Sequence, residues 1–329
     1  MLRILCTLTF ICLLGQGCED IADLADANDC FTGTNLLSSR QSDAIDELVY
    51  AYLDDYSYIS VAVIAGEDVK MTRSYGMDRI GRTDVYASVS KPVTSMILAQ
   101  LLEQGYIESF DDPIGKYSDK YKDAMPDEYK DTPLTFKHLL SHQGGVPHHE
   151  RIWSGGKLDL EFRPGTDVMY STRGYGILGD IMSELTGLSY NRLVKEYIGE
   201  PVGANSFSVP NFLFEAPGGL VNSTIGDMAK FARGVMIGTY ASDSLAMNQL
   251  WYPWANDELG LGWYVINHGT DSLSVYHAGS NGFPRAFMVL RPVHKLGVAL
   301  LGKCSSSDGD QRFYLLARDI MRQLEDFEY

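Results

Sequence analysis

Apolar residues recur at strand spacing near both ends of the chain. The run 59–65 is apolar and rich in β-branched residues, a Gly66-Glu67-Asp68 turn follows it, and a second run covers 69–75. This pattern is typical of a β-hairpin. Near the other end, four further segments, separated by Gly, Asn and Pro, predict strands at 262–267, 273–277, 286–290 and 296–300.

Each group of predicted strands has an amphipathic helix beside it. Apolar residues recur at helical spacing from Ile45 to Leu53 and again from Phe313 to Leu324. An antiparallel sheet built from both chain ends, with the two terminal helices packed on it, buries all these faces. We therefore predict an α+β fold, an α/β sandwich, as one domain over 36–329. A mostly helical subdomain, about 108–255, is inserted between the sheet parts, about 36–107 and 256–329.

The first residues predict export. Arg3 precedes an uncharged apolar run, 4–14, which suits a signal peptide and is too short to span a bilayer. The sequence Leu14-Gly15-Gln16-Gly17-Cys18 is similar to a bacterial lipoprotein cleavage site, although Gly15 stands where Leu is usual. We predict a signal peptide at 1–17, a lipid on Cys18 and an acidic tether at 18–35. Cleavage without lipidation and an uncleaved anchor are the alternatives.

Composition and charge exclude some classes of partner. Hydrophobic residues make up 45% of the chain and charged residues 21%, which is typical of a globular protein. A net charge of −16 repels phosphate backbones, so we expect no nucleic acid partner. The membrane is expected as a partner only through Cys18, which places the protein in the periplasm or on the cell surface.

Cysteine usage leaves one question open. With the signal removed and Cys18 lipidated, Cys30 and Cys304 remain, and they either pair or stay as separate thiols. No Cys or His spacing is typical of zinc. His148, His149 and Glu150 form a polar cluster, which we interpret as a loop near a cleft rather than a metal site. We expect neither a metal nor a cofactor.

The strongest chemical signal is a serine three residues before a lysine. Ser88 and Lys91 precede apolar residues at helical spacing, and Pro92 is tolerated only in a first helical turn. Ser88 is therefore expected at the start of a buried helix, with Lys91 on the same face. A neighbouring amine can take the serine proton and make the hydroxyl nucleophilic.

This spacing alone is common, and the chain contains a second example. Ser154 and Lys157 have the same separation, but two glycines stand between them where a helix would have to begin. We interpret Ser154 as a loop residue.

Two further motifs supply partners for Ser88. Tyr170 lies in Tyr170-Ser171-Thr172, just before a predicted helix, and an ammonium beside its hydroxyl would lower the pKa of the phenol and make it a general base. His277, in His277-Ala278-Gly279, lies on a late strand and is expected to donate to a substrate carboxylate or carbonyl, while Gly279 allows close approach of a substrate backbone.

The order of these motifs resembles the class C β-lactamase and D-alanyl-D-alanine carboxypeptidase superfamily of penicillin-recognising serine hydrolases. The resemblance covers about residue 40 to the C-terminus. Three flanking phrases are also similar to those of the family: Leu134 to Pro147, Phe162 to Thr166 with Leu185 to Gly187, and Gly218 to Phe231.

The resemblance implies a β-lactamase/transpeptidase-like fold and a role for each motif residue. Ser88 would be acylated, and Lys91 and Tyr170 would share the general-base work. The backbone amides of Ser88 and Ser280 would form the oxyanion hole. Thr172, His277, Gly279 and Ser280 would contact a small-molecule or peptide substrate.

Two departures from the family pattern bear on the substrate. His277-Ala278-Gly279 stands where many β-lactamases have Lys-Thr-Gly, and Thr172 stands where an Asn is common. The first departure is similar to the carboxypeptidases, D-aminopeptidases and esterases of the superfamily. The second argues against strong β-lactamase activity and leaves open the expected hydrolysis of esters or D-amino-acid peptides. A true β-lactamase and a non-hydrolytic penicillin-binding sensor are the alternatives.

Overall fold

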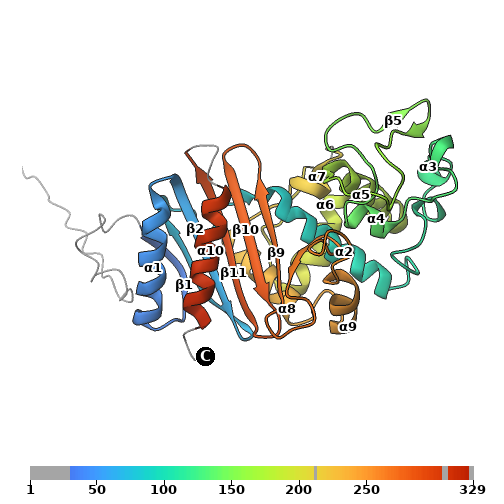
Figure 1. Cartoon of the computed structure of the whole chain (residues 1–329). Helices are drawn as coiled ribbons and strands as arrows, with labels where there is room; N and C mark the ends of the chain where they lie inside the picture. Colours follow the sequence, from blue (N-terminus) through green and yellow to red (C-terminus); the bar gives the residue numbers. More distant parts are fainter. Residues whose placement is uncertain (1–29, 211–212, 306–309, 326–329) are drawn as a thin grey trace, which may run out of the picture.

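A computed structural model describes residues 30–210, 213–305 and 310–325 (Figure 1). The predicted signal peptide and the lipidation site at Cys18 lie outside these residues. Within the described ranges, no helix is long and apolar enough to cross a membrane.

A seven-stranded sheet forms one half of the molecule, and every neighbouring pair of its strands is antiparallel. The hairpin from the N-terminal part pairs with the last strand of the chain, so both chain ends contribute to the centre of the sheet. The strand order is β1 (Cys30–Asn35), β3 (Asp68–Tyr75), β2 (Tyr56–Ala65), β11 (Leu296–Cys304), β10 (Pro284–Arg291), β9 (Ser274–Ser280) and β8 (Tyr264–Ile266).

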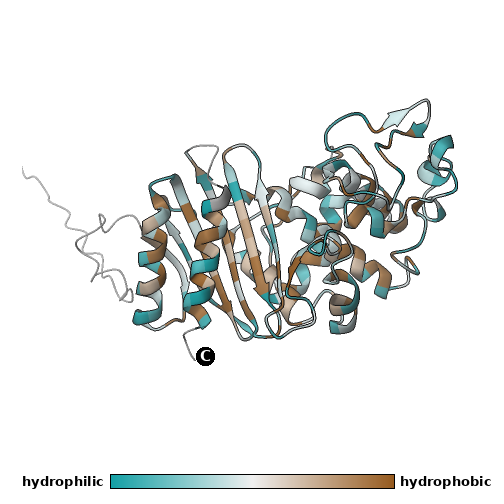
Figure 2. Cartoon of the chain, in the orientation of Figure 1, coloured by the Kyte–Doolittle hydropathy of each residue, from teal (hydrophilic) through white to brown (hydrophobic). Residues whose placement is uncertain are grey.

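The two terminal helices cover one face of this sheet (Figure 1). They are α1 (Ser39–Leu53) and α10 (Asp310–Glu325), and their apolar sides share a buried cluster with β2, β3 and β11. Ser38 caps α1 in a reciprocal bond with Gln41, which fixes where the helix begins. In Figure 2, apolar residues follow the strands, and both helices carry hydrophilic residues beside apolar ones.

The other face of the sheet packs against the helical part of the chain. α8 (Ile225–Met236) lies against β2, β3 and β11. The other helices and short strands of this part are β4 (Asp84–Val85), η1 (Ala87–Val89), α2 (Ser90–Glu103), η2 (Ile114–Lys116), α3 (Asp119–Lys122), η3 (Asp127–Tyr129), α4 (Phe136–Leu140), β5 (Trp153–Ser154), β6 (Lys157–Leu158), α5 (Thr172–Thr186), α6 (Tyr190–Leu193), η4 (Val194–Gly199), η5 (Glu200–Val202), α7 (Ala216–Gly219), β7 (Asn222–Ser223), α9 (Asp243–Leu245) and η6 (Ala246–Leu250).

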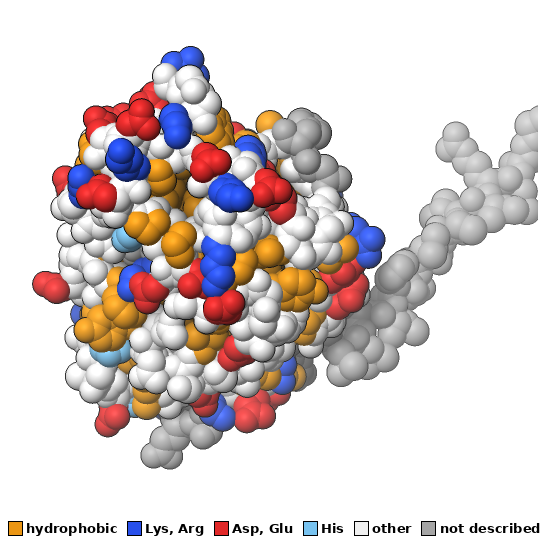
Figure 3. Space-filling model, turned by 90° about the vertical axis from the view of Figure 1, so that its right-hand side faces the viewer, with side chains coloured by type: hydrophobic (Ala, Val, Ile, Leu, Met, Phe, Trp, Pro, Cys, Tyr) orange, Lys and Arg blue, Asp and Glu red, His pale blue; other side chains and the backbone are white. Residues whose placement is uncertain are grey.

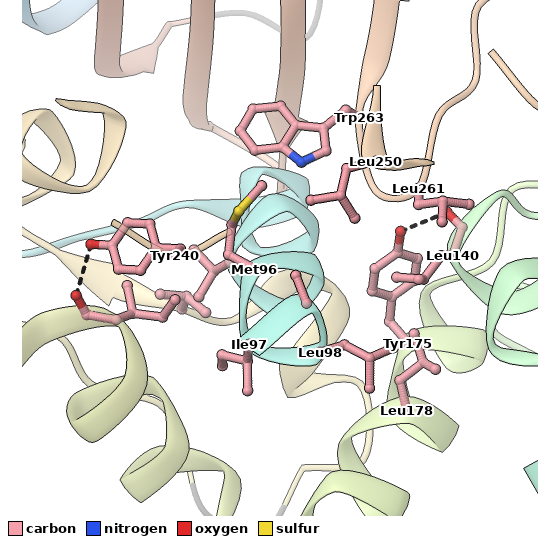
Figure 4. Packing of buried hydrophobic residues seen from close by; sticks show 14 of the residues in the cluster. Met96, Ile97, Leu98, Leu140, Tyr175, Leu178, Tyr240, Leu250, Leu261 and Trp263 are labelled. Atoms are coloured by element: carbon pink, nitrogen blue, oxygen red, sulfur yellow. Dashed lines mark hydrogen bonds between the residues drawn. The ribbon is translucent and has the colours of Figure 1, made fainter. Parts of the chain in front are cut away.

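α2 runs through the centre of the helical part and is surrounded by apolar side chains. Met96, Ile97 and Leu98 point in different directions, and each meets packed residues (Figure 4). The hydroxyls of Tyr175 and Tyr240 donate to backbone carbonyls at the edges of this core. A helix held on all sides presents its first turn in a fixed position, which matters for the residues that begin it. Over the helical end of the molecule, acidic and basic side chains are interspersed (Figure 3).

The predicted α+β fold is confirmed, but the predicted acidic tether is too long. Cys30–Asn35 is not a tether: it forms β1, the edge strand that pairs with β3. The sequence misses this strand because its residues are mostly small and polar, so the backbone hydrogen bonds to β3 hold it rather than a buried face.

The open question about the two cysteines has a geometric answer. Cys30 and Cys304 lie on strands with two others between them, and no disulfide joins them. Three strand spacings amount to about 14 Å. A disulfide requires Cα atoms within about 7 Å, so these two thiols are too far apart to pair.

Candidate active site

Ser88 lies in η1, the single turn that leads into α2. Ala87, directly before it, has a φ of 46°, a conformation that L residues rarely adopt. The neighbouring segment fixes this turn at two points: Tyr86 donates its N–H to the Val221 carbonyl at 2.8 Å, and Val221 donates its N–H to the Ser90 hydroxyl at 3.0 Å. The nucleophile candidate therefore lies on a strained and anchored turn.

Lys91 lies fully buried beneath Ser88. Its Nζ is 3.3 Å from Ser88 Oγ, 2.7 Å from the Gly218 carbonyl and 3.4 Å from Thr172 Oγ1. Burial lowers the pKa of Lys91 well below its ordinary value. A neutral amine has two N–H groups, which the Gly218 and Thr172 oxygens accept, so its lone pair is left for the Ser88 hydroxyl.

The protonated form of Lys91 also has partners. Its Nζ lies 4.4 Å from the ring centroid of Tyr170 and 5.4 Å from that of Tyr175. Aromatic faces attract a cation at such distances. Burial in this pocket thus favours the neutral amine, while the two aromatic rings lie where they would stabilise an ammonium.

Tyr170 stands two residues before α5 and lines the same cleft as Ser88. His142 holds the loop: its Nδ1 accepts the N–H of Ser171 at 3.1 Å, and its ring lies 4.3 Å from the Tyr170 ring. Burial raises the pKa of Tyr170, and the neighbouring Ser88 side chain lowers it by less. The expected fall in this pKa is therefore wrong, because desolvation of the phenolate outweighs its neighbours.

Thr172, the first residue of α5, lies below the cleft rather than in its wall. Its hydroxyl is directed at Lys91 Nζ, and its N–H donates to Nδ1 of His148 at 3.1 Å. The structure thus places Thr172 to orient Lys91, which differs from the substrate contact expected from the sequence.

β9 passes directly beside the Ser88 turn at Gly279. A Cβ on Gly279 would lie 2.4 Å from the Tyr86 carbonyl oxygen and 3.0 Å from the Ser88 backbone nitrogen. Only glycine allows this approach. It brings the end of β9, with Ser280, next to the Ser88 amide, where the sequence predicts the oxyanion hole.

His277 is buried on β9, and its Nδ1 lies 2.7 Å from the Ala278 carbonyl oxygen. Burial, with a smaller contribution from Lys91, lowers the pKa of His277 to about 3. The imidazole is therefore neutral near pH 7. Because a carbonyl only accepts, Nδ1 carries the proton, and Nε2 is an acceptor rather than the donor expected from the sequence.

A cleft with a volume of about 490 Å³ opens above these residues. It brings together Ser88, Tyr170, His277, Gly279 and Ser280, from segments far apart in the sequence. The residues that line it and that the sequence analysis did not assign to the site are His148, Tyr264, Tyr276, Ala278, Arg285, Ala286, Phe287 and Phe313.

Two residues of the site that the sequence analysis did not assign, one in the cleft wall and one beneath it, can be related to features of the sequence. Tyr264 lies on a predicted strand, directly opposite Tyr276 on β9, so the pairing of the two strands would have placed it near the site. Gly218, whose carbonyl binds Lys91, begins one of the phrases shared with the family, although a backbone acceptor leaves no mark of its own in a sequence.

His148, His149 and Glu150 form a polar loop at the rim of the cleft. The His148 and His149 rings lie 3.7 Å apart, and Glu150 Oε2 accepts the N–H of His149. Among the described residues, no group of three or more His, Cys, Asp or Glu side chains is placed to hold a metal ion.

Comparison with known proteins agrees with the family resemblance that the motifs of the sequence indicate. A profile of the family described as Beta-lactamase matches residues 45–319. The D-alanyl-D-alanine-carboxypeptidase/endopeptidase AmpH of Escherichia coli (strain K12) is 24% identical over 319 residues, covering 76% of this chain and 82% of its own.

Solved structures share the fold at low sequence identity. The Beta-lactamase/D-alanine Carboxypeptidase from Yersinia pestis, complexed with citrate, aligns with a TM-score of 0.69 and 20% identity, covering 86% of this chain and 98% of its own. The D-amino acid amidase from Ochrobactrum anthropi SV3 aligns with a TM-score of 0.70 and 15% identity, covering 86% and 99%. With its motifs, its fold and a profile match over most of its length, this chain belongs to the Beta-lactamase family.

Proposed function

We propose that this protein is a serine hydrolase that forms an acyl-enzyme on Ser88 and cleaves esters or D-amino-acid peptides. The observation that carries the proposal is the position of the buried Lys91 Nζ, 3.3 Å from Ser88 Oγ, with the Gly218 carbonyl at 2.7 Å and Thr172 Oγ1 at 3.4 Å as further acceptors. A neutral amine whose lone pair faces a serine hydroxyl is a general base for that serine.

Acylation follows from this geometry. Lys91 takes the proton of Ser88 while Oγ attacks the substrate carbonyl carbon. The N–H groups of Ser88 and Ser280 donate to the oxyanion. Tyr170 gives its proton to the leaving group as the bond to the acyl carbon breaks, and the Lys91 ammonium restores the phenol.

Deacylation uses the same groups. Lys91, neutral again, takes a proton from a water molecule, whose oxygen attacks the acyl carbon. The bond from that carbon to Ser88 Oγ breaks, and Oγ takes the proton back from the Lys91 ammonium. The product acid leaves, and the enzyme returns to its starting state.

Covalent labelling together with a substrate panel tests the proposal. The folded protein is treated with a fluorophosphonate, and the modified residue is located by mass spectrometry. In parallel, p-nitrophenyl esters, D-alanyl peptides and nitrocefin are assayed. We expect an adduct on Ser88 and turnover of esters or D-alanyl peptides. An unlabelled Ser88 contradicts the mechanism, a burst without turnover identifies a sensor, and nitrocefin as the best substrate identifies a β-lactamase.

Tyr170→Phe is expected to slow peptide hydrolysis about 10²-fold and p-nitrophenyl ester hydrolysis much less. The reason is that burial keeps the phenol protonated, so it acts as an acid, and a nitrophenolate leaves without a proton. Steady-state kinetics on both substrates measure the difference. An equal loss on both substrates would identify Tyr170 as a base for Ser88 instead.

Gly279→Ala is expected to lower kcat about 10²- to 10³-fold, as loss of one oxyanion donor does. The new methyl group would overlap the Tyr86 carbonyl and push β9 away from Ser88. Gly282→Ala is the matched control, because a Cβ there meets nothing within 4 Å, although its φ of 68° adds local strain. Unchanged kcat in Gly279→Ala would show that the β9 amide does not serve the oxyanion.

A further inference from the structure

His148, at the rim of the cleft, is held in one tautomer by a backbone amide. Its Nδ1 lies 3.1 Å from the backbone nitrogen of Thr172, and an amide N–H can only donate. Nδ1 therefore carries the lone pair. Burial and the adjacent His149 lower the pKa of His148, so the ring is neutral and its proton is on Nε2.

His277, which also lines the cleft, is held in the other tautomer. Its Nδ1 faces the Ala278 carbonyl at 2.7 Å and carries the proton, so Nε2 has the lone pair. The cleft thus contains one imidazole that donates through Nε2 and one that accepts through Nε2. Neither ring offers a positive charge to a substrate.

The remaining walls offer little to a carboxylate. Among the described residues that line the cleft, Arg285 is the charged side chain, and its Nη1 donates to the carbonyls of Gly282 and Pro284. Ala278 supplies no hydroxyl. Glu258, in an adjoining hollow that shares Tyr170 and Tyr264 with the cleft, adds negative charge.

We infer that the cleft recognises an uncharged substrate, an ester or a peptide blocked at its C-terminus, through the His148 Nε2 donor and the His277 Nε2 acceptor. This inference rests on the proposed hydrolase function and narrows its substrate class. A carboxylate beside the scissile bond would face the His277 lone pair and the field of Glu258, and Arg285, the charged side chain of the lining, already donates to the carbonyls of Gly282 and Pro284. A carboxamide at the same place presents an N–H to that lone pair.

Two peptides that differ in one group test the inference on the full-length protein. One is an N-blocked tripeptide ending in D-alanyl-D-alanine, and the other is its C-terminal carboxamide, so the scissile bond is the same. Release of D-alanine or D-alaninamide is followed by mass spectrometry. We expect kcat/KM to be at least about 10-fold higher for the carboxamide, which corresponds to about 1.4 kcal/mol. Equal values, or preference for the acid, would overturn the inference.

Variants of the two histidines locate the effect. His277→Lys replaces the lone pair with a cation and is expected to shift the preference toward the acid at least about 10-fold. His148→Asn keeps an acceptor for the Thr172 amide but loses the Nε2 donor, so KM for the carboxamide peptide should rise about 10-fold with kcat little changed. His148→Gln, which reaches the Nε2 position, should restore KM. If His277→Lys does not change the preference for the carboxamide peptide over the acid peptide, His277 does not take part in substrate recognition.

Hydrolysis of p-nitrophenyl acetate separates this inference from the proposed function. This ester has neither an amide nor a carboxylate, so it reports only on Ser88 and its bases. If wild type cleaves the ester but prefers the acid peptide, the hydrolase function stands and the inferred preference for an uncharged substrate is wrong. If wild type cleaves none of the three substrates, both the proposed function and the inference are wrong.

Discussion

Ser88→Ala is expected to lower kcat/KM by at least about 10⁴-fold for every substrate the protein hydrolyses. The substitution removes the oxygen that forms the acyl-enzyme, and Lys91 then has no hydroxyl to activate. Steady-state kinetics on an ester and a peptide measure the loss. Circular dichroism and thermal unfolding check the fold, which should be kept because Ser88 contributes only a short side chain to its turn.

Ser154→Ala is the matched control for this loss. Ser154 and Lys157 repeat the spacing of Ser88 and Lys91, but they lie on the β5–β6 hairpin, and Lys157 donates to the Asp123 carbonyl. Activity should stay within about twofold of wild type, as expected for an exposed site away from the chemistry. Loss of activity in Ser154→Ala, or its survival in Ser88→Ala, would place the nucleophile elsewhere.

Most of the sheet could be predicted because the local pattern of apolar residues and turns identifies its strands. β2 and β11 are buried on both faces and are continuous apolar runs, and turns rich in Gly or Pro separate the others. β1 could not be predicted, since its residues are mostly small and polar and backbone bonds to β3 hold it rather than a buried apolar face. The predicted strands at both chain ends implied the central pairing of β2 with β11.

The candidate site divides in the same way between local and tertiary causes. The spacing of Ser88 and Lys91 is local, and the helix that carries them follows from the apolar residues after Pro92. The pKa of Tyr170 depends on burial, and the tautomer of His277 depends on the Ala278 carbonyl beside its Nδ1; only the assembled fold supplies both. The sequence could therefore name these residues but not their protonation states.

Thr172 shows the same limit for a side-chain direction. Its place in Tyr170-Ser171-Thr172 marks it as a site residue, and its distance of 3.4 Å from Lys91 Nζ agrees with that. Which neighbour the hydroxyl faces depends on how α5 and α7 pack against α2, and this packing brings Tyr175 of α5 and Gly218 of α7 to the same amine. A residue expected to contact the substrate thus contacts Lys91, the proposed base, instead.

Lys91→Met is expected to lower kcat/KM about 10³- to 10⁴-fold, because Met fills similar space but takes no proton from Ser88. Lys157→Met, which removes the amine of the second serine–lysine pair, is the matched control and should keep near-normal rates. In wild type, kcat/KM should rise with pH through the lowered pKa of Lys91, since only the neutral amine is a base. Near-normal rates in Lys91→Met would assign the base to another group.

The same lysine links stability to pH. Its folded pKa lies below the ordinary lysine value of 10.5, so between these two values the unfolded chain binds a proton that the folded protein does not. The contribution of Lys91 to the free energy of unfolding therefore rises with pH up to the unfolded pKa, by at most about 1.4 kcal/mol per pH unit. Met binds no proton, so the difference between wild type and Lys91→Met isolates this contribution. We expect urea unfolding at several pH values from about 7 to 10 to show that the free energy of unfolding of wild type increases with pH relative to that of Lys91→Met. A difference that stays constant with pH would mean that Lys91 keeps its charge in the folded protein and cannot be the base that Ser88 needs.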